Sequence, residues 1–319
     1  MPLFVVHNAK VGKKVKKVLY NFSLVKYNPI IQTNPATPGT KEKERKIMKK
    51  FIAMILAVLM MAACLAACQP AASNAGTTEE AKKPTVVVGY TIYEPMNYFD
   101  ENNNLIGYDT DLAKAVFEKL GYEVIFQEID WASKYTDLDS NTIDCVWNGF
   151  TCNTADDDGI ARSEKVDFSY NYMENRQVII AKADSGIASA ADLNGKLAAV
   201  ESGSAGETYA KSFEGVNVKG FLKQTDCLME VNAGTADFAV LDAQLAKSYA
   251  GKGDYANIVI IDALSSEVEY YAIGFKKGSE LTAKVNAQLE ALAADGTIAT
   301  LAEKYGVANT AITDFADQK

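Results

Sequence analysis

Four segments of the chain place charged or polar groups where a strand or turn is expected to end. Asp242 follows the apolar run Phe238–Leu241 and precedes a helix pattern, so its carboxylate sits at the C-terminal end of a strand. Gly203-Ser204-Ala205-Gly206 and Asn148-Gly149-Phe150-Thr151 each follow an apolar run, and Arg162 comes shortly after the second. Ligands of open α/β sheets gather at the carboxyl ends of strands.

These groups suit a small ligand that carries one positive and one negative charge. Burying either charge unpaired costs several kcal/mol, so such a site needs a carboxylate and a cation. Asp242 can take the positive group, and the planar fork of Arg162 can bond both oxygens of a carboxylate. Backbone N–H groups at the helix start after Ser204 add oriented donors. Each group also has a structural reading: a helix cap for Asp242, an empty turn at 203–206, and a surface charge for Arg162.

Metal and nucleophile chemistry is largely excluded. The only histidine is His7, so residues after 68 hold neither a histidine-rich zinc site nor a Ser-His-Asp triad. The acidic turn 100–111 has Leu105 where a calcium loop needs glycine, and 156–158 lacks the spacing of such a loop. No metal and no cofactor are expected.

Cysteine use leaves two possibilities open. There are five cysteines and no CxxC spacing: Cys64, Cys68, Cys145, Cys152 and Cys227. Cys145 and Cys152 could pair outside the cell and leave Cys227 free. The alternative is that they are buried thiols.

The surrounding pattern alternates apolar runs with amphipathic segments, which predicts a mainly parallel sheet covered by helices. Asp109 is expected to cap the first helix and Gly121 to stop it. About 235 folded residues are long for one core, so two α/β lobes are expected. The predicted strands are 85–89, 123–129, 143–147, 178–181, 197–200, 236–241, 258–261 and 270–275, and the predicted helices are 109–120, 188–193, 206–212, 242–250, 281–294 and 298–305.

The segment from Met48 to Cys68 has the features of a lipoprotein signal peptide. Two lysines precede the apolar stretch Phe51–Ala63, which is short for a membrane span. Leu65-Ala66-Ala67-Cys68 supplies small residues before a cysteine that would be lipidated and become the new N-terminus. An uncleaved anchor helix, or a buried helix with a stray cysteine, is the alternative.

The residues on either side of the signal complete this organisation. Residues 1–47 are basic and proline-containing, and we interpret them as a mis-called extension, with translation starting at Met48. Residues 68–83 are rich in Ala, Thr, Glu and Lys and are expected to form a flexible tether.

The charge of the remainder bears on its partners. Residues 1–68 hold 12 Lys and Arg but only 2 Asp and Glu, which leaves 20 basic and 39 acidic residues and a net charge of −19. Phosphate backbones repel such a domain, so nucleic acid is not expected as a partner.

An ordered set of short motifs resembles one family. Ile106-Gly107-Tyr108-Asp109-Thr110-Asp111-Leu112-Ala113 is similar to the G-F-D-x-D-L-A signature of the extracellular solute-binding proteins of polar amino-acid ABC transporters, solute-binding protein family 3. The resemblance runs from about Thr85 to Tyr305. The further matching segments are 143–151, 165–169, 192–196, 203–205, 236–242 and 271–278.

The resemblance implies a two-lobe, periplasmic-binding-protein-like (type II) α/β fold with a hinge of two crossing strands. Lobe 1 would comprise residues 84–175 plus 265–319, and lobe 2 residues 176–264. The protein would be a monomer without enzymatic activity, lipid-anchored on the extracellular or periplasmic side of the cell membrane. It would capture a free amino acid, close around it, and deliver it to an ABC permease.

The resemblance also implies roles for individual residues. It gives the ligand ammonium to Asp242 and places Tyr93 over the ligand side chain. The carboxylate falls to Arg162, although the apparent insertion Thr154–Gly159 displaces this arginine from the family spacing. Trp131 and Trp147 would be pocket or near-pocket aromatics, with core positions as the alternative. The remaining implied contacts are Ser204, Ala205, Asn148, Gly149 and Thr151.

Two other functions remain open at this point. Some relatives on this fold dehydrate prephenate-like substrates, for which Glu94 and Glu201 are the available general acids. A ligand sensor is the third possibility. Which amino acid binds is also open, because Glu94, Asp130 and Glu201 could line a pocket for lysine or arginine or could be solvated.

Overall fold

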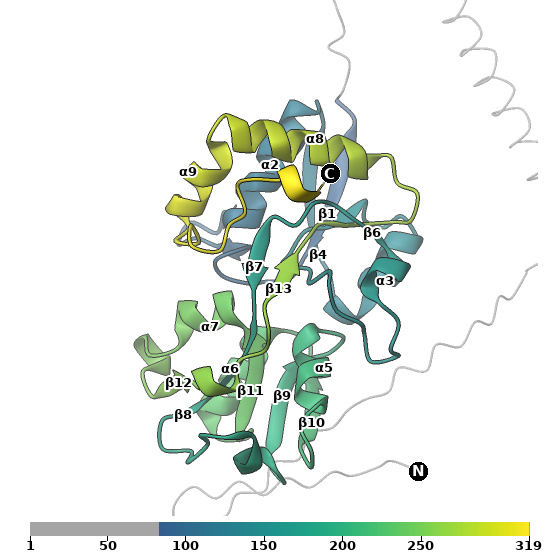
Figure 1. Cartoon of the computed structure of the whole chain (residues 1–319). Coiled ribbons are helices and arrows are strands. Elements are labelled where there is room, and N and C mark those ends of the chain that lie inside the picture. Colours follow the sequence, from purple (N-terminus) through teal and green to yellow (C-terminus); the bar gives the residue numbers. More distant parts are fainter. Residues whose placement is uncertain (1–82, 319) are drawn as a thin grey trace, which may run out of the picture. The chain divides into compact units, whose positions relative to one another are not determined.

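The computed structural model describes residues 83–318, which form two five-stranded sheets with helices packed against them (Figure 1). The predicted extension 1–47, the predicted signal peptide, the predicted lipidation site Cys68 and the predicted tether up to residue 82 lie outside the described residues. We call the first sheet with its helices lobe 1 and the second sheet with its helices lobe 2.

The sheet of lobe 1 has the strand order β4-β1-β5-β14-β6. Parallel pairs join β1 to β4 and β5, whereas β14 runs antiparallel to β5 and β6. The strands are β1 (Thr85–Tyr90), β4 (Glu123–Glu128), β5 (Cys145–Val146), β6 (Asp167–Phe168) and β14 (Gly274–Phe275). The helices are α2 (Tyr108–Lys119), α3 (Lys134–Asp139), α4 (Arg162–Lys165), α8 (Leu281–Ala294) and α9 (Thr297–Lys304), and a hairpin of β2 (Tyr98–Phe99) and β3 (Leu105–Ile106) precedes α2.

The sheet of lobe 2 repeats this plan with the order β10-β9-β11-β8-β12. Here β9 pairs parallel with β10 and β11, and β8 pairs antiparallel with β11 and β12. The strands are β8 (Gln177–Lys182), β9 (Leu197–Glu201), β10 (Asn217–Phe221), β11 (Phe238–Asp242) and β12 (Ile258–Ile260), and the helices are α5 (Ala205–Lys211), α6 (Gln224–Ala233) and α7 (Ala243–Tyr249).

Two short antiparallel strands, β7 (Met173–Asn175) and β13 (Glu269–Tyr271), carry the chain between the sheets (Figure 1). The chain leaves lobe 1 through β7 and returns through β13. After β7 the chain enters the lobe 2 sheet as β8, and after β13 it enters the lobe 1 sheet as β14. Both of these strands run antiparallel to their neighbours. Each sheet thus has four strands in one direction and one reversed strand, so the predicted mainly parallel sheets are present, with β14 and β8 as the exceptions.

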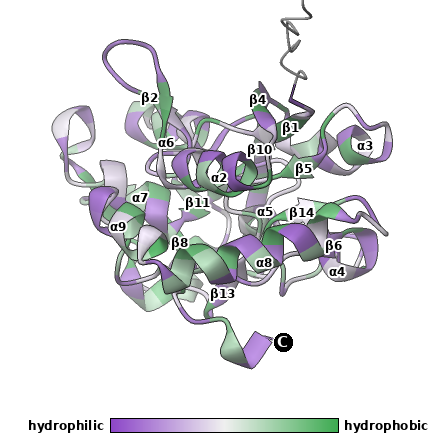
Figure 2. Ribbon diagram, turned by 90° about the horizontal axis from the view of Figure 1, so that it is seen from above, coloured by the Kyte–Doolittle hydropathy of each residue, from purple (hydrophilic) through white to green (hydrophobic). Residues whose placement is uncertain are grey.

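The central strands are buried on both faces, as their continuous apolar runs predict. In β8, Val178 and Ile180 pack into one hydrophobic cluster while Ile179 and Ala181 pack into another on the opposite face. Helices supply the covering layers, and α2 and α8 carry both hydrophilic and hydrophobic residues (Figure 2). Because these strands are packed on both faces, the residues at their ends are held rigidly.

Several local predictions are corrected by the structure. The helix predicted to start at Asp109 starts one residue earlier, after Gly107, and Asp109 does not cap it. Gly121 does end it, with φ of 81°. The strand predicted at 270–275 is divided between β13 and β14, because the hinge and the sheet need different directions. Sequence patterns also missed β10 and α6.

Cys145, Cys152 and Cys227 are all free thiols. Burial raises the pKa of Cys152 to about 11, and burial also raises the pKa values of Cys145 and Cys227. Among residues 83–318, no helix combines the length and the apolar character that crossing a bilayer demands.

Candidate functional site

One small cavity is lined by residues of both lobes and gathers most of the predicted site. Lobe 1 contributes Trp131, Asn148, Gly149, Thr151 and Arg162, and lobe 2 contributes Glu201, Ser204, Ala205, Gln224 and Asp242. Eight of the nine residues predicted to bind the ligand thus line the cavity. The ninth, Tyr93, does not.

Asp242 is the last residue of β11, at the carboxyl end of this strand, and is 6% exposed. Although it occupies the N-cap position of α7, its carboxylate makes no cap hydrogen bond. Instead, Oδ1 accepts hydrogen bonds from the side-chain amides of Asn175, at 2.8 Å, and Gln177. Oδ2 accepts one from Gln224. The reading of Asp242 as a simple helix cap is therefore wrong, because neutral amides orient this carboxylate.

A second buried carboxylate, Glu269, shares these amides. Its Oε1 accepts hydrogen bonds from Asn175 Nδ2 and Gln177 Nε2, both at 2.6 Å, and from Thr151 Oγ1 at 3.0 Å. Burial, followed by the charge of Asp242, raises the pKa of Glu269 to about 7, and burial also raises the pKa of Asp242. A cation in the cavity would favour the ionised form of both groups.

Arg162 starts α4, is 1% exposed and lines the cavity. Its Nε donates to Asp156 Oδ1 at 2.8 Å, Nη1 to the carbonyl of Thr151 at 3.1 Å, and Nη2 to the carbonyl of Gly203 at 3.3 Å. These three bonds to described residues use three of its five N–H donors, which leaves one on each terminal nitrogen.

The apparent insertion Thr154–Gly159 fixes this arginine. Burial alone would raise the pKa of Asp156, but Arg162, Lys165 and Tyr135 bring it down to about 2. Asp156 is therefore a stable anion that holds the guanidinium in place. The departure from the family spacing does not remove Arg162 from the cavity.

The turn before α5 presents a helix N-terminus to the cavity. Ser204 is the N-cap, and its Oγ accepts a hydrogen bond from Glu207 N at 3.0 Å. The N–H groups that open a helix have no acceptor within it, so those after Ser204 are suited to an anionic or carbonyl oxygen. Ala205, whose N–H is one of these, lines the cavity.

The segment 148–151 is held from within lobe 1. Asn148 donates to Thr91 O and Asn97 Oδ1 at 2.8 and 2.7 Å, and accepts from Thr91 Oγ1, so its amide is already satisfied. Gly149, at φ 57°, donates its N–H to Asp109 Oδ2 at 3.0 Å. This contact explains why Asp109 does not cap α2.

The aromatic residues divide between cavity and core. Trp131 lines the cavity and packs edge-on against Phe150, with ring centroids 5.2 Å apart. Trp147 is fully buried against Phe117 and Tyr172, so it is a core residue. Tyr93 is turned inward, and its hydroxyl lies 2.6 Å from that of Tyr271.

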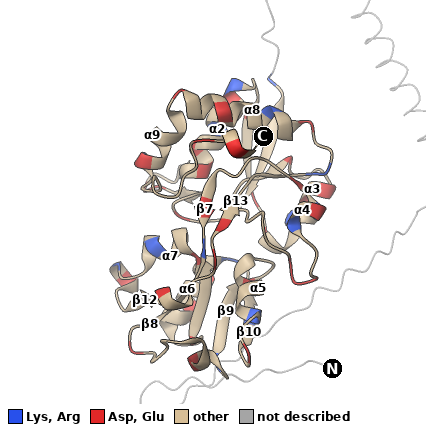
Figure 3. Ribbon diagram, in the orientation of Figure 1, with Lys and Arg blue, Asp and Glu red and all other residues tan. Residues whose placement is uncertain are grey.

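Sequence reasoning missed several polar residues here. Three of them lie on or beside the hinge strands: Asn175, Gln177 and Glu269. The only sequence signal for a site role there is a polar residue next to an apolar run. Gln224 carries no signal at all, since its helix was not predicted. Acidic residues also occur on both hinge strands (Figure 3).

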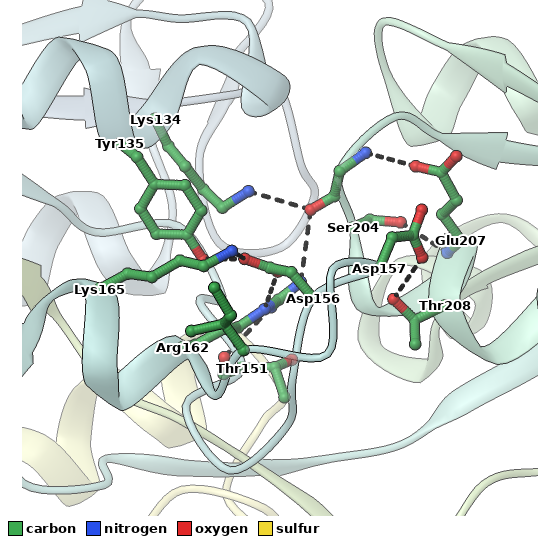
Figure 4. Close-up of polar contacts among 12 residues, drawn as sticks. Lys134, Tyr135, Thr151, Asp156, Asp157, Arg162, Lys165, Ser204, Glu207 and Thr208 are labelled. Atoms are coloured by element: carbon green, nitrogen blue, oxygen red, sulfur yellow. Dashed lines mark hydrogen bonds and ion pairs between the residues drawn. The ribbon is translucent and has the colours of Figure 1, made fainter.

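Polar contacts join the lobes beside the cavity (Figure 4). The carbonyl of Gly203 in lobe 2 accepts hydrogen bonds from Arg162 Nη2 and, at 3.0 Å, from Lys134 Nζ. Asp157 of the insertion accepts a hydrogen bond from Thr208 Oγ1 at 3.1 Å and pairs with Lys211. These contacts connect the two lobes next to the cavity residues Arg162 and Ser204.

Comparison with known proteins agrees with this geometry. The model of the bacterial extracellular solute-binding proteins, family 3, matches residues 86–308. The arginine-binding extracellular protein ArtP of Bacillus subtilis (strain 168) is 32% identical over 237 residues, which are 73% of this chain and 90% of that protein.

Two solved structures extend the comparison. An ancestral arginine-binding protein bound to arginine is 35% identical with a TM-score of 0.64, covering 70% of this chain and 99% of its own. The ancestral amino acid-binding protein AncCDT-1, a precursor of cyclohexadienyl dehydratase, is 32% identical with a TM-score of 0.61, covering 69% and 95%. The predicted two-lobe, type II fold is confirmed. The chain belongs to the bacterial extracellular solute-binding proteins of family 3.

Proposed function

We propose that this protein captures a free amino acid outside the cell and delivers it to an ABC importer. The observation that carries the proposal is the pairing of Asp242 and Arg162 across one cavity, one from each lobe. A zwitterion matches these two charges in sign. The helix start at Ala205 supplies a further donor for the ligand carboxylate.

Closure of the lobes would follow from this division of the site. A ligand bound to Arg162 alone or to Asp242 alone gains half of the available contacts, so the closed form is favoured only when both are engaged. The ABC permease would then recognise the closed form. The names of the relatives, which include an arginine-binding protein, agree with an amino-acid ligand.

Retention at the cell surface would depend on Cys68. We expect the chain to be processed at Cys68, lipidated there and retained on the outer side of the cytoplasmic membrane as a monomer. Metabolic labelling with a fatty-acid analogue in a bacterial host tests this. Cys68→Ser should abolish the label and release the protein into the medium or periplasm, and unchanged labelling would refute the anchor.

A ligand screen tests the binding function directly. Thermal shift and calorimetry over the twenty amino acids, cystine, ornithine and citrulline should identify at least one ligand with micromolar or tighter affinity. No heat and no shift with any of them would overturn the proposal. In a host that needs the ligand, deletion of the neighbouring permease should abolish uptake without changing binding.

A second function is favoured by one observation. Glu201 lines the cavity, and burial followed by the charge of Asp242 raises its pKa to about 8, as a general acid at neutral pH requires. Glu94, the other carboxylate considered, does not line the cavity. Absorbance assays with a prephenate-like substrate test for a dehydratase. Turnover that disappears in Glu201→Gln would support it, and no turnover would exclude it for that substrate.

A further inference from the structure

The cavity is lined by more ionisable side chains than a simple zwitterion needs. Asp242 and Arg162 match an ammonium and a carboxylate one to one. Glu201 is left as a third ionisable side chain on the same cavity, and a simple zwitterion offers no group for it. Glu201 ends β9, the parallel neighbour of β11. The carboxyl groups of Glu201 and Asp242 therefore stand at the carboxyl ends of two adjacent strands of the lobe 2 sheet.

Glu201 is built into the cavity wall without a full set of partners. The residue is 3% exposed, and its Oε1 has no hydrogen-bond partner among the described residues. Gln224 donates a hydrogen bond to the carboxylate. A buried carboxylate oxygen without a donor is unfavourable, so a ligand group that supplies one gains more binding energy here than at an exposed site.

The charged side chains near Glu201 do not provide a partner for its carboxylate, which leaves that role to the ligand. Asp242 and Asp226 repel a second anion, whereas the charge of Lys134 favours ionised Glu201. However, the ammonium of Lys134 donates to the carbonyls of Gly203 and Trp131 and forms no ion pair with Glu201. It lies among aromatic rings, 4.6 Å from the centroid of Tyr135. Lys134 is therefore committed to the contact between lobes.

We infer that Glu201 receives the distal, positively charged end of the ligand side chain, so that the protein selects amino acids with a cationic side chain. The inference rests on the proposed binding function and gives a role to Glu201, the third ionisable side chain of the cavity. Trp131 on the opposite lobe adds an aromatic surface against which a guanidinium can stack.

Arginine and citrulline test this inference, because they have nearly the same shape and differ in side-chain charge. Calorimetry on the wild type should give at least tenfold tighter binding of arginine or lysine than of citrulline or glutamine. Glu201→Gln should weaken arginine about 10- to 100-fold and change citrulline less than threefold. Glu214→Gln, at an exposed carboxylate of the same lobe that does not line the cavity, is the control.

Proton release provides a second readout. A cation beside Glu201 should drive its carboxyl to ionise, so arginine binding at neutral pH should release more protons than citrulline binding. Calorimetry in phosphate and in Tris buffer measures this difference. It should disappear in Glu201→Gln, whose folding is checked by its melting temperature.

The outcomes separate the two proposals. If the wild type binds no amino acid, the proposed function fails. If it binds citrulline or glutamine as tightly as arginine, the function stands and the inference is wrong. If Glu201→Gln weakens all ligands equally, Glu201 shares the α-ammonium with Asp242, and the inference is again wrong.

Discussion

The two lobes stabilise the charged groups of the cavity in different ways. In lobe 1 the guanidinium of Arg162 already has a counter-ion, Asp156, at 2.8 Å. In lobe 2 the carboxylates of Asp242 and Glu201 have no cation within ion-pair distance among residues 83–318, and neutral amides hold Asp242. Lobe 1 therefore has a charge-balanced half-site, whereas in lobe 2 two buried carboxyls have no counter-cation until a ligand supplies one.

This contrast predicts that the largest loss follows from changing lobe 2. Asp242→Asn removes the charge that faces the ligand ammonium, and breaking a buried ion pair costs about 3–5 kcal/mol. We expect calorimetry to detect no binding at millimolar ligand. Without ligand the melting temperature should stay the same or rise, because repulsion with Glu269 is relieved.

The matched control is Asp254→Asn, an exposed acidic residue of the same lobe. It should bind like the wild type. An Asp242→Asn protein with affinity within tenfold of wild type would show that the ligand ammonium lies elsewhere.

A smaller loss is expected in lobe 1. Arg162→Lys keeps the positive charge but loses the planar fork, so the ligand carboxylate loses one hydrogen bond to a charged group, worth about 1.5–3 kcal/mol. Calorimetry should show weaker binding of every amino acid by a similar factor. Arg176→Lys, at the only other arginine after residue 68, is exposed and should have no effect. Equal effects of the two variants would contradict the role of Arg162.

Two buried carboxyls with raised pKa values, Glu201 in lobe 2 and Glu269 on the hinge strand β13, also predict a pH dependence of stability. Glu201 and Glu269 have pKa values of about 8 and 7 in the fold, above those of an unfolded chain. Between pH 5 and 7 the folded protein therefore binds more protons than the unfolded one, and its free energy of unfolding falls as pH rises. Lys134, with pKa lowered to about 7, acts only above this window.

Thermal melts of the ligand-free protein should thus give a higher melting temperature at pH 5 than at pH 7. Stabilisation by a saturating ligand should be larger at pH 7, where the carboxylates ionise more readily. A ligand-free melting temperature that rises from pH 5 to pH 7 would contradict the described environment of these groups.

The smallest effect is expected at the contact between the lobes. Asp157 of the insertion pairs with Lys211 and Thr208, and its side chain is exposed. Such pairs contribute about 0–1 kcal/mol and weaken with salt. Asp157→Asn should reduce affinity a few-fold at low salt and not at 1 M salt. Asp158→Asn, which loses a pair with Lys165 inside lobe 1, should leave affinity unchanged.

Sequence patterns located the elements with strong periodicity and the residues at their ends. Continuous apolar runs gave β1, β8, β9 and β11, and the end of β11 placed Asp242 in the cavity. They could not give strand order, because pairing depends on contacts between residues far apart. The mixed direction of both sheets follows from the hinge, which no local pattern reveals.

The polar support of the site was the least predictable part. Asn175 and Gln177 flank a hinge position, and their amides meet Asp242 only because the chain folds back over sequence separations of 67 and 65 residues. Glu269 reaches the same amides from β13. Asp109 illustrates the same limit, since a helix cap and a distant backbone N–H suit its carboxylate equally well until the fold is known.

The free thiols of the described domain have a practical consequence. Cys145 and Cys227 are buried, and Cys152 has a pKa of about 11, so very little thiolate is present at pH 7. A single new cysteine at an exposed position of the insertion, for example at Asp158, would react with a maleimide dye far faster than these three. A fluorophore there would report the approach of the lobes, so the domain is a ready starting point for a reagentless optical sensor of its ligand.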